Sequence, residues 1–304
     1  MRTLKSRQLL LFALVVGLLT ITLPCSARAD LNEVKERGVL RHLGVTYAHF
    51  VHEAPDGGYD GLDVEMMQLF AEYLGVKYQF VSTTWPNLFT DLTGRKLNAA
   101  THGYNPEVTQ EIKGDIIANG LTVLPNRKKV VNYSLPTFPT GVWLIAPANS
   151  TLAPITPSGN MKKDVTNVIA SLTNHSVLTM SNTCLDASYF NFDPSKISIK
   201  YFTSGKTIDE IVPAMLKGAA DTTLLDIPDA LILLEKMAGD IKIIGPVSDF
   251  QFMGTAVGKN SPELLKAFNL FFKQIWNDGT YRSLVKKYYP SVFLYLGDFF
   301  GKTY

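Results

Sequence analysis

A short β-strand is predicted at Gly38-Val39-Leu40-Arg41-His42-Leu43-Gly44-Val45, and a second at residues 78–81, Tyr-Gln-Phe-Val. Between them, residues 63–74 read Asp-Val-Glu-Met-Met-Gln-Leu-Phe-Ala-Glu-Tyr-Leu, and the apolar side chains recur at helical spacing. Asp63 is a residue type favoured at a helix N-cap. Strand, helix and strand form a βαβ unit, which predicts parallel strands covered by helices and an α/β fold.

The same alternation continues along the chain. Residues 147–159 are rich in Pro, Ser, Thr and Asn without apolar periodicity and are interpreted as a loop. The aromatic-rich residues 293–300 are expected to pack on the fold as a terminal segment. Further strands are predicted at residues 115–118, 142–146, 176–180 and 222–225, and helices at 208–216, 228–237, 262–276 and 281–287.

The first 29 residues have the features of a secretory signal peptide. Basic residues precede an uncharged apolar run at residues 9–23, and Ala27-Arg28-Ala29 matches an A-x-A cleavage site. An uncleaved membrane anchor is the alternative, but a spanning helix needs about 20 apolar residues. Lipid attachment at Cys25 is disfavoured because a proline precedes it. We therefore expect residues 1–29 to be removed during export.

Charge and cysteine content narrow the classes of function. The full chain has a formal net charge of +2, and removal of residues 1–29 takes away four basic residues and no acidic one, which leaves −2. This balance argues against a nucleic-acid partner, whose phosphates need clustered Lys and Arg. Cys184 is the sole cysteine after cleavage, so no disulfide can form within the mature chain. Residues 30–304 are long enough for two domains.

Several short motifs follow one another in the order found in a known family. The most specific is Asn119-Gly120-Leu121-Thr122-Val123-Leu124-Pro125-Asn126-Arg127, which resembles the signature Gly-Met-Thr-x-Thr-Pro-Glu-Arg. Tyr47-Ala48-His49-Phe50 is similar to Tyr-x-Pro-Phe, and residues 59–65 to the helix start Gly-Phe-Asp-Val-Asp. Residues 132–138, 221–226 and 279–281 continue the series. Together the motifs resemble family 3 of the extracellular solute-binding proteins, the amino-acid-binding group with the type II periplasmic fold.

The resemblance implies a two-lobed α/β protein with its ligand in the cleft between the lobes. It puts the two hinge crossings near Thr140-Gly141 and Gly254-Thr255. Lobe 1 then comprises residues 30–140 and 255–304, and lobe 2 residues 141–254. A site between two lobes also follows the general preference of small ligands for domain interfaces.

Arg127 is the candidate for binding the ligand's carboxylate. The planar guanidinium can grip a carboxylate with two parallel bonds, which a lysine cannot do as specifically. The alternative is a solvated arginine at a helix start, where its charge opposes the helix dipole. The resemblance adds Thr122 as a donor to the same carboxylate, with a local turn hydroxyl as its alternative. It also adds Gly120, which allows close approach of the backbone.

Asp226 is the candidate for binding the ligand's ammonium. It ends a predicted strand, and in α/β sheets the carboxyl ends of strands face the ligand crevice. The resemblance assigns the same role to it. The alternative is an N-cap for the helix predicted from Pro228, a favoured first helical residue.

Aromatic residues and one turn complete the candidate ligand contacts. Tyr47, Phe50 and Trp85 match family positions whose rings pack against the ligand, and a core position is the alternative for each. Residues 181–186 resemble a family turn whose N–H groups hold anionic ligand atoms. Thr183 and Cys184 are the contacts expected from it, although Cys184 replaces a hydroxyl with a thiol and has a buried small hydrophobic residue as its alternative.

Two departures from the family pattern bear on the ligand. The resemblance places an acid at the position of Gly44 in proteins that bind basic amino acids. The glycine at this position therefore argues against lysine or arginine as the ligand. Residues 97–114 are an insertion, expected to be a solvated loop at the rim of the cleft. Its residues His102, Tyr104 and Glu107 are weaker candidates for ligand neighbours.

The resemblance implies a monomeric, non-enzymatic periplasmic protein that delivers an amino acid or related small carboxylate to an inner-membrane ABC permease. Neither a cofactor nor a metal is expected, because His49, His52 and Glu53 lie in loop-like sequence without an evident fourth ligand. A sensory module read by a membrane receptor or kinase is one alternative. An enzyme similar to the cyclohexadienyl dehydratases is another, with Asp186 or Glu53 as general acid.

Overall fold

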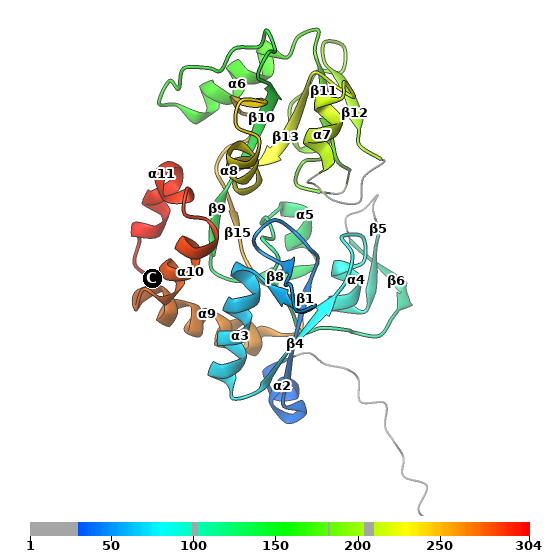
Figure 1. Ribbon diagram of the computed structural model, residues 1–304. Helices are drawn as coiled ribbons and strands as arrows, with labels where there is room; N and C mark the ends of the chain where they lie inside the picture. Colours follow the sequence, from blue (N-terminus) through cyan, green and yellow to red (C-terminus); the bar gives the residue numbers. More distant parts are fainter. Residues whose placement is uncertain (1–29, 99–102, 182, 204–209) are drawn as a thin grey trace, which may run out of the picture.

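The computed structural model describes residues 30–98, 103–181, 183–203 and 210–304. The predicted signal peptide and His102 lie outside the described residues. None of the helices in the described ranges is long and apolar enough to cross a membrane. Two lobes are visible in Figure 1, each built on a five-stranded sheet.

The sheet of lobe 1 has the order β4-β1-β7-β16-β8. The parallel strands predicted from the βαβ unit are confirmed, since β1 pairs in parallel with β4 and β7. The other two strands were not predicted. β16 pairs antiparallel with both β7 and β8, so β16 runs against the direction of the other four strands. The strands are β1 (Val39–Gly44), β4 (Lys77–Ser82), β7 (Ile116–Ile117), β8 (Val131–Tyr133) and β16 (Ala256–Gly258).

Helices cover the sheet of lobe 1. The helix predicted after Asp63 is confirmed as α3 (Leu62–Leu74), but Gly61 occupies its N-cap and Asp63 lies in the first turn. The predicted cap is therefore wrong. The carboxylate of Asp63 instead accepts a hydrogen bond of 2.6 Å from Gly120 N. The remaining helices of this lobe are α2 (Leu31–Arg37), α4 (Leu88–Thr93), α5 (Pro125–Lys128), α9 (Pro262–Asn277), α10 (Thr280–Tyr288) and α11 (Val292–Leu296).

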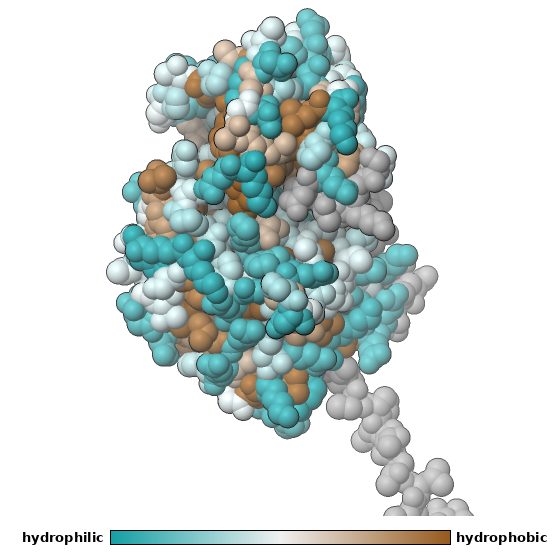
Figure 2. Space-filling view, in the orientation of Figure 1, coloured by the Kyte–Doolittle hydropathy of each residue, from teal (hydrophilic) through white to brown (hydrophobic). Residues whose placement is uncertain are grey.

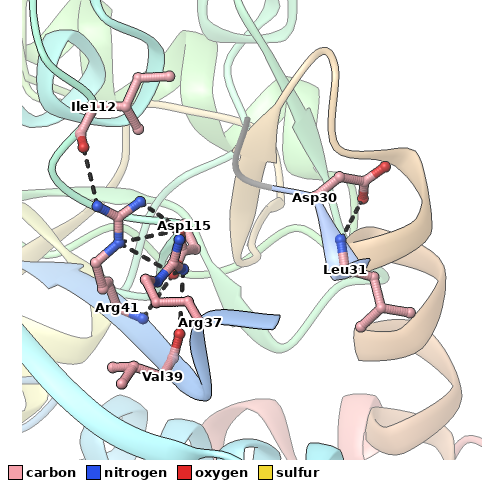
Figure 3. Close-up of polar contacts among 7 residues, drawn as sticks. All are labelled: Asp30, Leu31, Arg37, Val39, Arg41, Ile112 and Asp115. Atoms are coloured by element: carbon pink, nitrogen blue, oxygen red, sulfur yellow. Dashed lines mark hydrogen bonds and ion pairs between the residues drawn. The ribbon is translucent and has the colours of Figure 1, made fainter. Parts of the chain in front are cut away.

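A buried ion network joins β1 to the start of β7. The Asp115 side chain is 0% exposed and accepts bonds from Arg37 Nη2 at 2.5 Å and Arg41 Nη2 at 2.8 Å (Figure 3). Arg41 also donates to the carbonyl of Ile112. A buried carboxylate is costly unless charged donors surround it, so these two arginines offset the burial of Asp115 and connect α2 and β1 to the start of β7.

The sheet of lobe 2 has the order β12-β11-β13-β10-β14. Strand β11 pairs in parallel with β12 and β13, whereas β10 pairs antiparallel with β13 and β14. Its elements are β10 (Val142–Pro147), α6 (Met161–Ser171), β11 (Ser176–Thr179), η2 (Ala187–Tyr189), β12 (Ser198–Tyr201), α7 (Ile211–Leu216), β13 (Thr222–Asp226), α8 (Ile227–Lys236) and β14 (Ile241–Pro246).

Two antiparallel strands connect the lobes. β9 (Phe138–Thr140) pairs with β15 (Gln251–Met253), and this ribbon runs between the two sheets (Figure 1). The predicted crossings at residues 140–141 and 254–255 lie at opposite ends of the ribbon. The lobe boundaries themselves stay a prediction.

The insertion at residues 97–114 differs from the expected loop. β5 (Arg95–Asn98) and β6 (Gly103–Thr109) pair antiparallel. A second small pair is formed by β2 (His52–Glu53) and β3 (Tyr59–Asp60). Strand pairing thus gives part of the described backbone of the insertion partners other than water.

The aromatic C-terminal segment packs on lobe 1, as expected. Phe299 and Phe300 are buried, and Phe300 lies 6.0 Å from Trp276 between ring centroids. The segment 297–301 forms a 3-10 helix, η4 (Gly297–Gly301). Tyr304 donates a hydrogen bond of 2.8 Å to Pro136 O, which ties the end of the chain to lobe 1.

Candidate ligand-binding site

A small cavity lies where the two lobes face each other. Eight of the nine predicted ligand contacts line it, and Phe50 does not. Its volume is about 10 Å³, which is room for about one water molecule. With the lobes this close together the cavity is too small for an amino acid, and we call this the closed arrangement. Lobe 1 contributes Tyr47, Trp85, Gly120, Thr122 and Arg127, and lobe 2 contributes Thr183, Cys184 and Asp226.

Arg127 is buried and held by its own lobe. It lies in α5, which begins at Pro125, and its side chain turns back so that Nη1 donates to Thr122 O at 3.0 Å. The guanidinium carbon lies 5.7 Å from the centroid of the Phe89 ring. The residue is 8% exposed, so the alternative of a solvated arginine is wrong. A guanidinium has five N–H donors, so the bond to Thr122 leaves donors for a carboxylate in the cavity.

Thr122 positions the arginine through its backbone. Its carbonyl accepts from Arg127 and also from the Tyr133 hydroxyl, at 3.1 Å. Thr122 is 1% exposed and forms an isolated β-bridge with Met253 of β15. The arginine is thus anchored beside the ribbon that joins the lobes. Neither Tyr133 nor Phe89 was predicted as part of the site.

Gly120 is required by close packing. Its φ is +53°, and a Cβ built on it would lie 2.5 Å from the Phe50 ring. Phe50 itself is 1% exposed, and its ring centroid is 4.8 Å from that of Tyr289. The structure therefore places Phe50 in the core of lobe 1, behind the cavity wall. This agrees with the alternative given for Phe50 from the sequence, a core position.

Asp226 presents an unpaired carboxylate oxygen. It stands at the N-cap position of α8, yet its side chain makes no capping bond. Oδ2 accepts from Cys184 Sγ at 3.0 Å and from the Tyr47 hydroxyl at 3.2 Å. Oδ1 has no hydrogen-bond partner among the described residues, although Asp226 is 1% exposed. A buried acceptor without a hydrogen bond is costly. Oδ1 is therefore positioned to accept a hydrogen bond from a donor group of the ligand.

Burial also changes the protonation of this acid. It raises the pKa of Asp226 to about 6, against the lowering effects of the bonds from Cys184 and Tyr47 and of the Arg127 charge. The carboxyl group therefore gives up its proton about two pH units above its usual range. A bound ammonium would favour the ionised form.

Tyr47 links the lobes directly. Its hydroxyl reaches Asp226 and, at 2.9 Å, Asp229 Oδ2. Its ring stacks on Phe50 at 5.8 Å and meets Trp85 edge-on at 5.6 Å. Asp229 was not predicted. A signal for it exists, because it stands three residues after Asp226 on the first turn of α8, and positions three apart share a helix face.

A second contact between the lobes lies next to Arg127 in the chain. Asn126 Nδ2 donates to the Tyr189 hydroxyl at 2.7 Å. Asn126 belongs to α5 of lobe 1 and Tyr189 to η2 of lobe 2. The closed arrangement is thus held by side chains of the protein itself.

The predicted turn brings a thiol into the site. Cys184 is 7% exposed, and burial together with the Asp226 charge raises the pKa of its thiol well above the usual value. The thiol therefore stays neutral and donates a hydrogen bond to Asp226. A buried small hydrophobic residue, the alternative given for Cys184, would make no such bond. The Thr183 hydroxyl donates to Met180 O and accepts from Leu185 N, so it stabilises the turn itself. Asn182 lies outside the described residues.

Gly44 leaves no space for an acid. A Cβ on Gly44 would lie 2.7 Å from the Phe80 ring. Its neighbour Val45 N is bonded to Asn119 Oδ1 at 2.7 Å. The position that the family resemblance associates with basic ligands is thus filled by the aromatic ring.

The residues considered for metal binding or acid catalysis are not brought into the cavity. His49 and His52 lie 6.1 Å apart between ring centroids, and within the described part of the chain no group of three or more His, Cys, Asp or Glu could hold a metal ion. Glu53 is exposed on β2, and the Asp186 side chain caps η2 by accepting from Ser188 N. Neither lines the cavity.

Several known proteins are similar to this chain. The L-cystine-binding protein TcyJ of Escherichia coli (strain K12) is 25% identical over 260 residues, which cover 85% of each chain. A cyclohexadienyl dehydratase of Pseudomonas aeruginosa is 41% identical over 75 residues, 24% of this chain and 28% of the dehydratase. The crystal structure of the ancestral amino acid-binding protein AncCDT-1, a precursor of cyclohexadienyl dehydratase, matches with a TM-score of 0.63 and 27% identity over 85% of this chain and 98% of that one.

The family assignment follows from a match over most of the chain. The predicted two-lobed type II fold is confirmed by the two sheets and the solved structures that resemble it. The family model of the bacterial extracellular solute-binding proteins, family 3, matches residues 43–111 and 106–291. The chain therefore belongs to family 3 of the bacterial extracellular solute-binding proteins.

Proposed function

We propose that this protein binds an α-amino acid in the periplasm and delivers it to an ABC-type uptake permease. One observation carries the proposal. The guanidinium of Arg127 from lobe 1 and the buried carboxylate of Asp226 from lobe 2 line the same cavity, and the carboxylate has an unpaired oxygen. An α-amino acid carries a carboxylate for the first and an ammonium for the second.

The two charges lie on different lobes, which connects binding to closure. A ligand with both charges bridges the lobes and favours the closed arrangement over the open one, since it contacts both walls only there. TcyJ binds L-cystine and AncCDT-1 is an amino acid-binding protein, according to their names. These relatives support the ligand class.

The side chain of the ligand is expected to be uncharged. Phe80 fills the position beside Gly44, so an acid that would pair with a lysine or arginine side chain has no place there. Trp85 and Tyr47 offer aromatic surface instead. The lining of this cavity therefore suits uncharged amino acids better than basic ones.

A thermal-shift screen tests the proposal. The purified protein is heated with each common amino acid, with cystine, and with matched analogues that lack either the amino or the carboxyl group. A ligand present at about 100 times its Kd stabilises the protein by about 2.7 kcal/mol. We expect an uncharged amino acid to raise the melting temperature and both truncated analogues to fail. Equal shifts from an analogue without a carboxylate would refute the role of Arg127.

Delivery to a permease needs a separate test. Cells of the source organism that lack the gene should lose uptake of the radiolabelled ligand found in the screen. Uptake should return with the wild-type gene but not with the Arg127→Ala variant. Unchanged uptake in the deletion strain would favour the sensory role.

A second candidate function is acid-assisted elimination, as in a dehydratase. It is favoured by Asp226, whose pKa of about 6 suits a proton donor near neutral pH, and by the short match to a cyclohexadienyl dehydratase. Incubation of the protein with prephenate or arogenate distinguishes the two functions. Turnover that Asp226→Asn abolishes would establish the enzyme, and its absence together with an amino-acid thermal shift would establish the binding protein.

A further inference from the structure

A second and larger cavity lies between the lobes, away from the ligand cavity. We name it the rear crevice. Its volume is about 330 Å³, and its walls come from β10, β14, the loop before α6, and α11. Asp226 lines the ligand cavity whereas its neighbour Ile227 lines the rear crevice, so the two spaces lie on different sides of the start of α8. In Figure 1 the rear crevice corresponds to the region between α11 and α6.

The rear crevice is apolar and aromatic. Ile155, Ile243 and Leu296 contribute aliphatic surface. The rings of Trp143 and Tyr295 meet edge-on at 6.3 Å between centroids, which is a contact between lobe 2 and α11. Hydrophobic surface is visible on both lobes near where they meet (Figure 2). A space of this size and character is within the range of small-molecule sites, roughly 300–1,000 Å³.

Exposed aromatic side chains border the same space. Phe250 is 55% exposed and Tyr295 is 58% exposed, and both line the crevice. Large apolar side chains that stay exposed together beside a cavity mark binding sites more often than chance surface. Burial of these two rings by an occupant would remove apolar area from water.

The charges at the crevice are of one sign. Asp164 and Asp249 line it, and no Lys, Arg or His of the described residues does. Asp164 is 6% exposed and accepts from Ser158 N, whereas Asp249 is exposed. Carboxylates beside aromatic rings attract cations, through the charge and through the ring faces. An anionic occupant is disfavoured by the same groups.

We propose that the rear crevice is a second binding site, for a small hydrophobic ammonium ion. The apolar part of such an ion would pack against Ile155, Ile243 and Leu296. Its ammonium would face Asp249 and the rings of Trp143 and Tyr295. This site is separate from the amino-acid cavity, since the two share no lining residue.

Calorimetric titration with benzyltrimethylammonium tests the proposal, with benzyl alcohol as the uncharged comparison. We expect saturable binding of the cation. Tyr295→Ala removes an exposed ring and Asp249→Asn an exposed charge, and each should weaken the cation by about threefold or more. Benzyl alcohol should respond to Tyr295→Ala but not to Asp249→Asn.

Matched variants control for surface changes. Leu294→Ala alters an 82% exposed neighbour that does not line the crevice, and Asp240→Asn removes an exposed acid of the same lobe. Both should bind the cation as the wild type does. The proposal is overturned if the cation does not bind saturably or binds the Tyr295→Ala variant equally well. It is also overturned if Asp226→Asn, rather than Asp249→Asn, weakens binding, because the cation would then occupy the ligand cavity.

Discussion

The ligand cavity and the rear crevice are both formed by the two lobes, yet they differ in almost every physical respect. The ligand cavity measures about 10 Å³ and contains a buried cation and a buried anion from opposite lobes. The rear crevice measures about 330 Å³ and is bordered by the exposed rings of Phe250 and Tyr295 and by two acids, of which Asp249 is exposed and Asp164 is buried. Buried charges require specific partners, whereas an apolar space selects mainly by size and shape.

The difference also concerns how the lobes are held. On the ligand side, hydrogen bonds from Tyr47 to Asp226 and from Asn126 to Tyr189 cross between the lobes. At the rear crevice the rings of Trp143 and Tyr295 are in contact and connect lobe 2 to α11. Hydrogen bonds in a buried site depend strongly on geometry, so the ligand side should respond more sharply to substitution than the rear.

The largest expected effect is the loss of ligand binding in Arg127→Ala. Truncating one partner of a buried charge pair costs about 4 kcal/mol, which is about a thousandfold in affinity. We expect this loss for the amino acid found in the thermal screen, measured by calorimetry. Arg127→Lys keeps the charge without the planar fork and should lose about tenfold. Benzyltrimethylammonium binding should be unchanged, and a parallel loss there would mean that the two sites are not separate.

The next effect concerns pH and Asp226. Because the native pKa is raised to about 6, the native state holds this proton more tightly than the unfolded state does. Below about pH 4 the protonated Asp226 contributes about 3 kcal/mol to the free energy of unfolding. This contribution is lost as the pH rises through 6. Asp63, whose burial raises its pKa to about 7, acts in the same direction.

Denaturation of wild type and Asp226→Asn at pH 4, 5, 6 and 7 measures this contribution. The variant should be similar to the wild type at pH 4 and more stable by up to about 3 kcal/mol at pH 7. Asp240→Asn, an exposed acid of lobe 2, controls for the change in net charge. Parallel stability curves for wild type and Asp226→Asn would contradict a raised pKa.

The sequence predicted eight residues that line one cavity because these residues belong to ordered motifs. Arg127, Thr122 and Gly120 lie in one stretch, and Asp226 ends a recognisable strand. These signals are local, and the α/β order brings them to one cleft. Phe50 was assigned to the ligand because its motif does not show which face of the backbone its ring takes.

Features that depend on distant contacts were missed. The spacing of Asp229 from Asp226 places both on one helix face, but its contact with Tyr47 of the other lobe is set by the tertiary structure and was not predicted. The helix α6 was missed because its exposed face is polar, although Asn160 caps it by accepting from Lys163 N. The rear crevice joins residues around 143, 155, 243 and 295, which no motif connects.

Removing the Tyr47 hydroxyl should have a moderate effect. Tyr47→Phe keeps the ring against Phe50 and Trp85 but deletes the donor to Asp226 and Asp229. Loss of a buried bond to a charged acceptor should lower the free energy of unfolding of the ligand-free protein by about 1.5 kcal/mol. Urea denaturation measures it. Tyr59→Phe, on β3 and outside the cavity, is the matched control, and equal losses in both variants would argue against a specific role for the Tyr47 hydroxyl.

The smallest expected effect is a coupling between the two sites, and it depends on both proposals. Both spaces have walls from the two lobes in the arrangement described, so we expect an occupant of either to favour the arrangement in which the other binds. One ring contact, between Trp143 and Tyr295, joins the lobes at the rear, so we expect saturating benzyltrimethylammonium to tighten amino-acid binding by only about twofold.

Reciprocal titrations measure this coupling. By linkage, the amino acid must tighten the cation by the same factor, and Tyr295→Ala should remove both effects while leaving amino-acid binding without the cation unchanged. Binding of both ligands with no mutual effect would show that the rear crevice keeps its shape when the lobes move. α11 would then have to move together with lobe 2 when the lobes separate. In that case the rear crevice would not change with the ligand cavity, and the two sites would be independent.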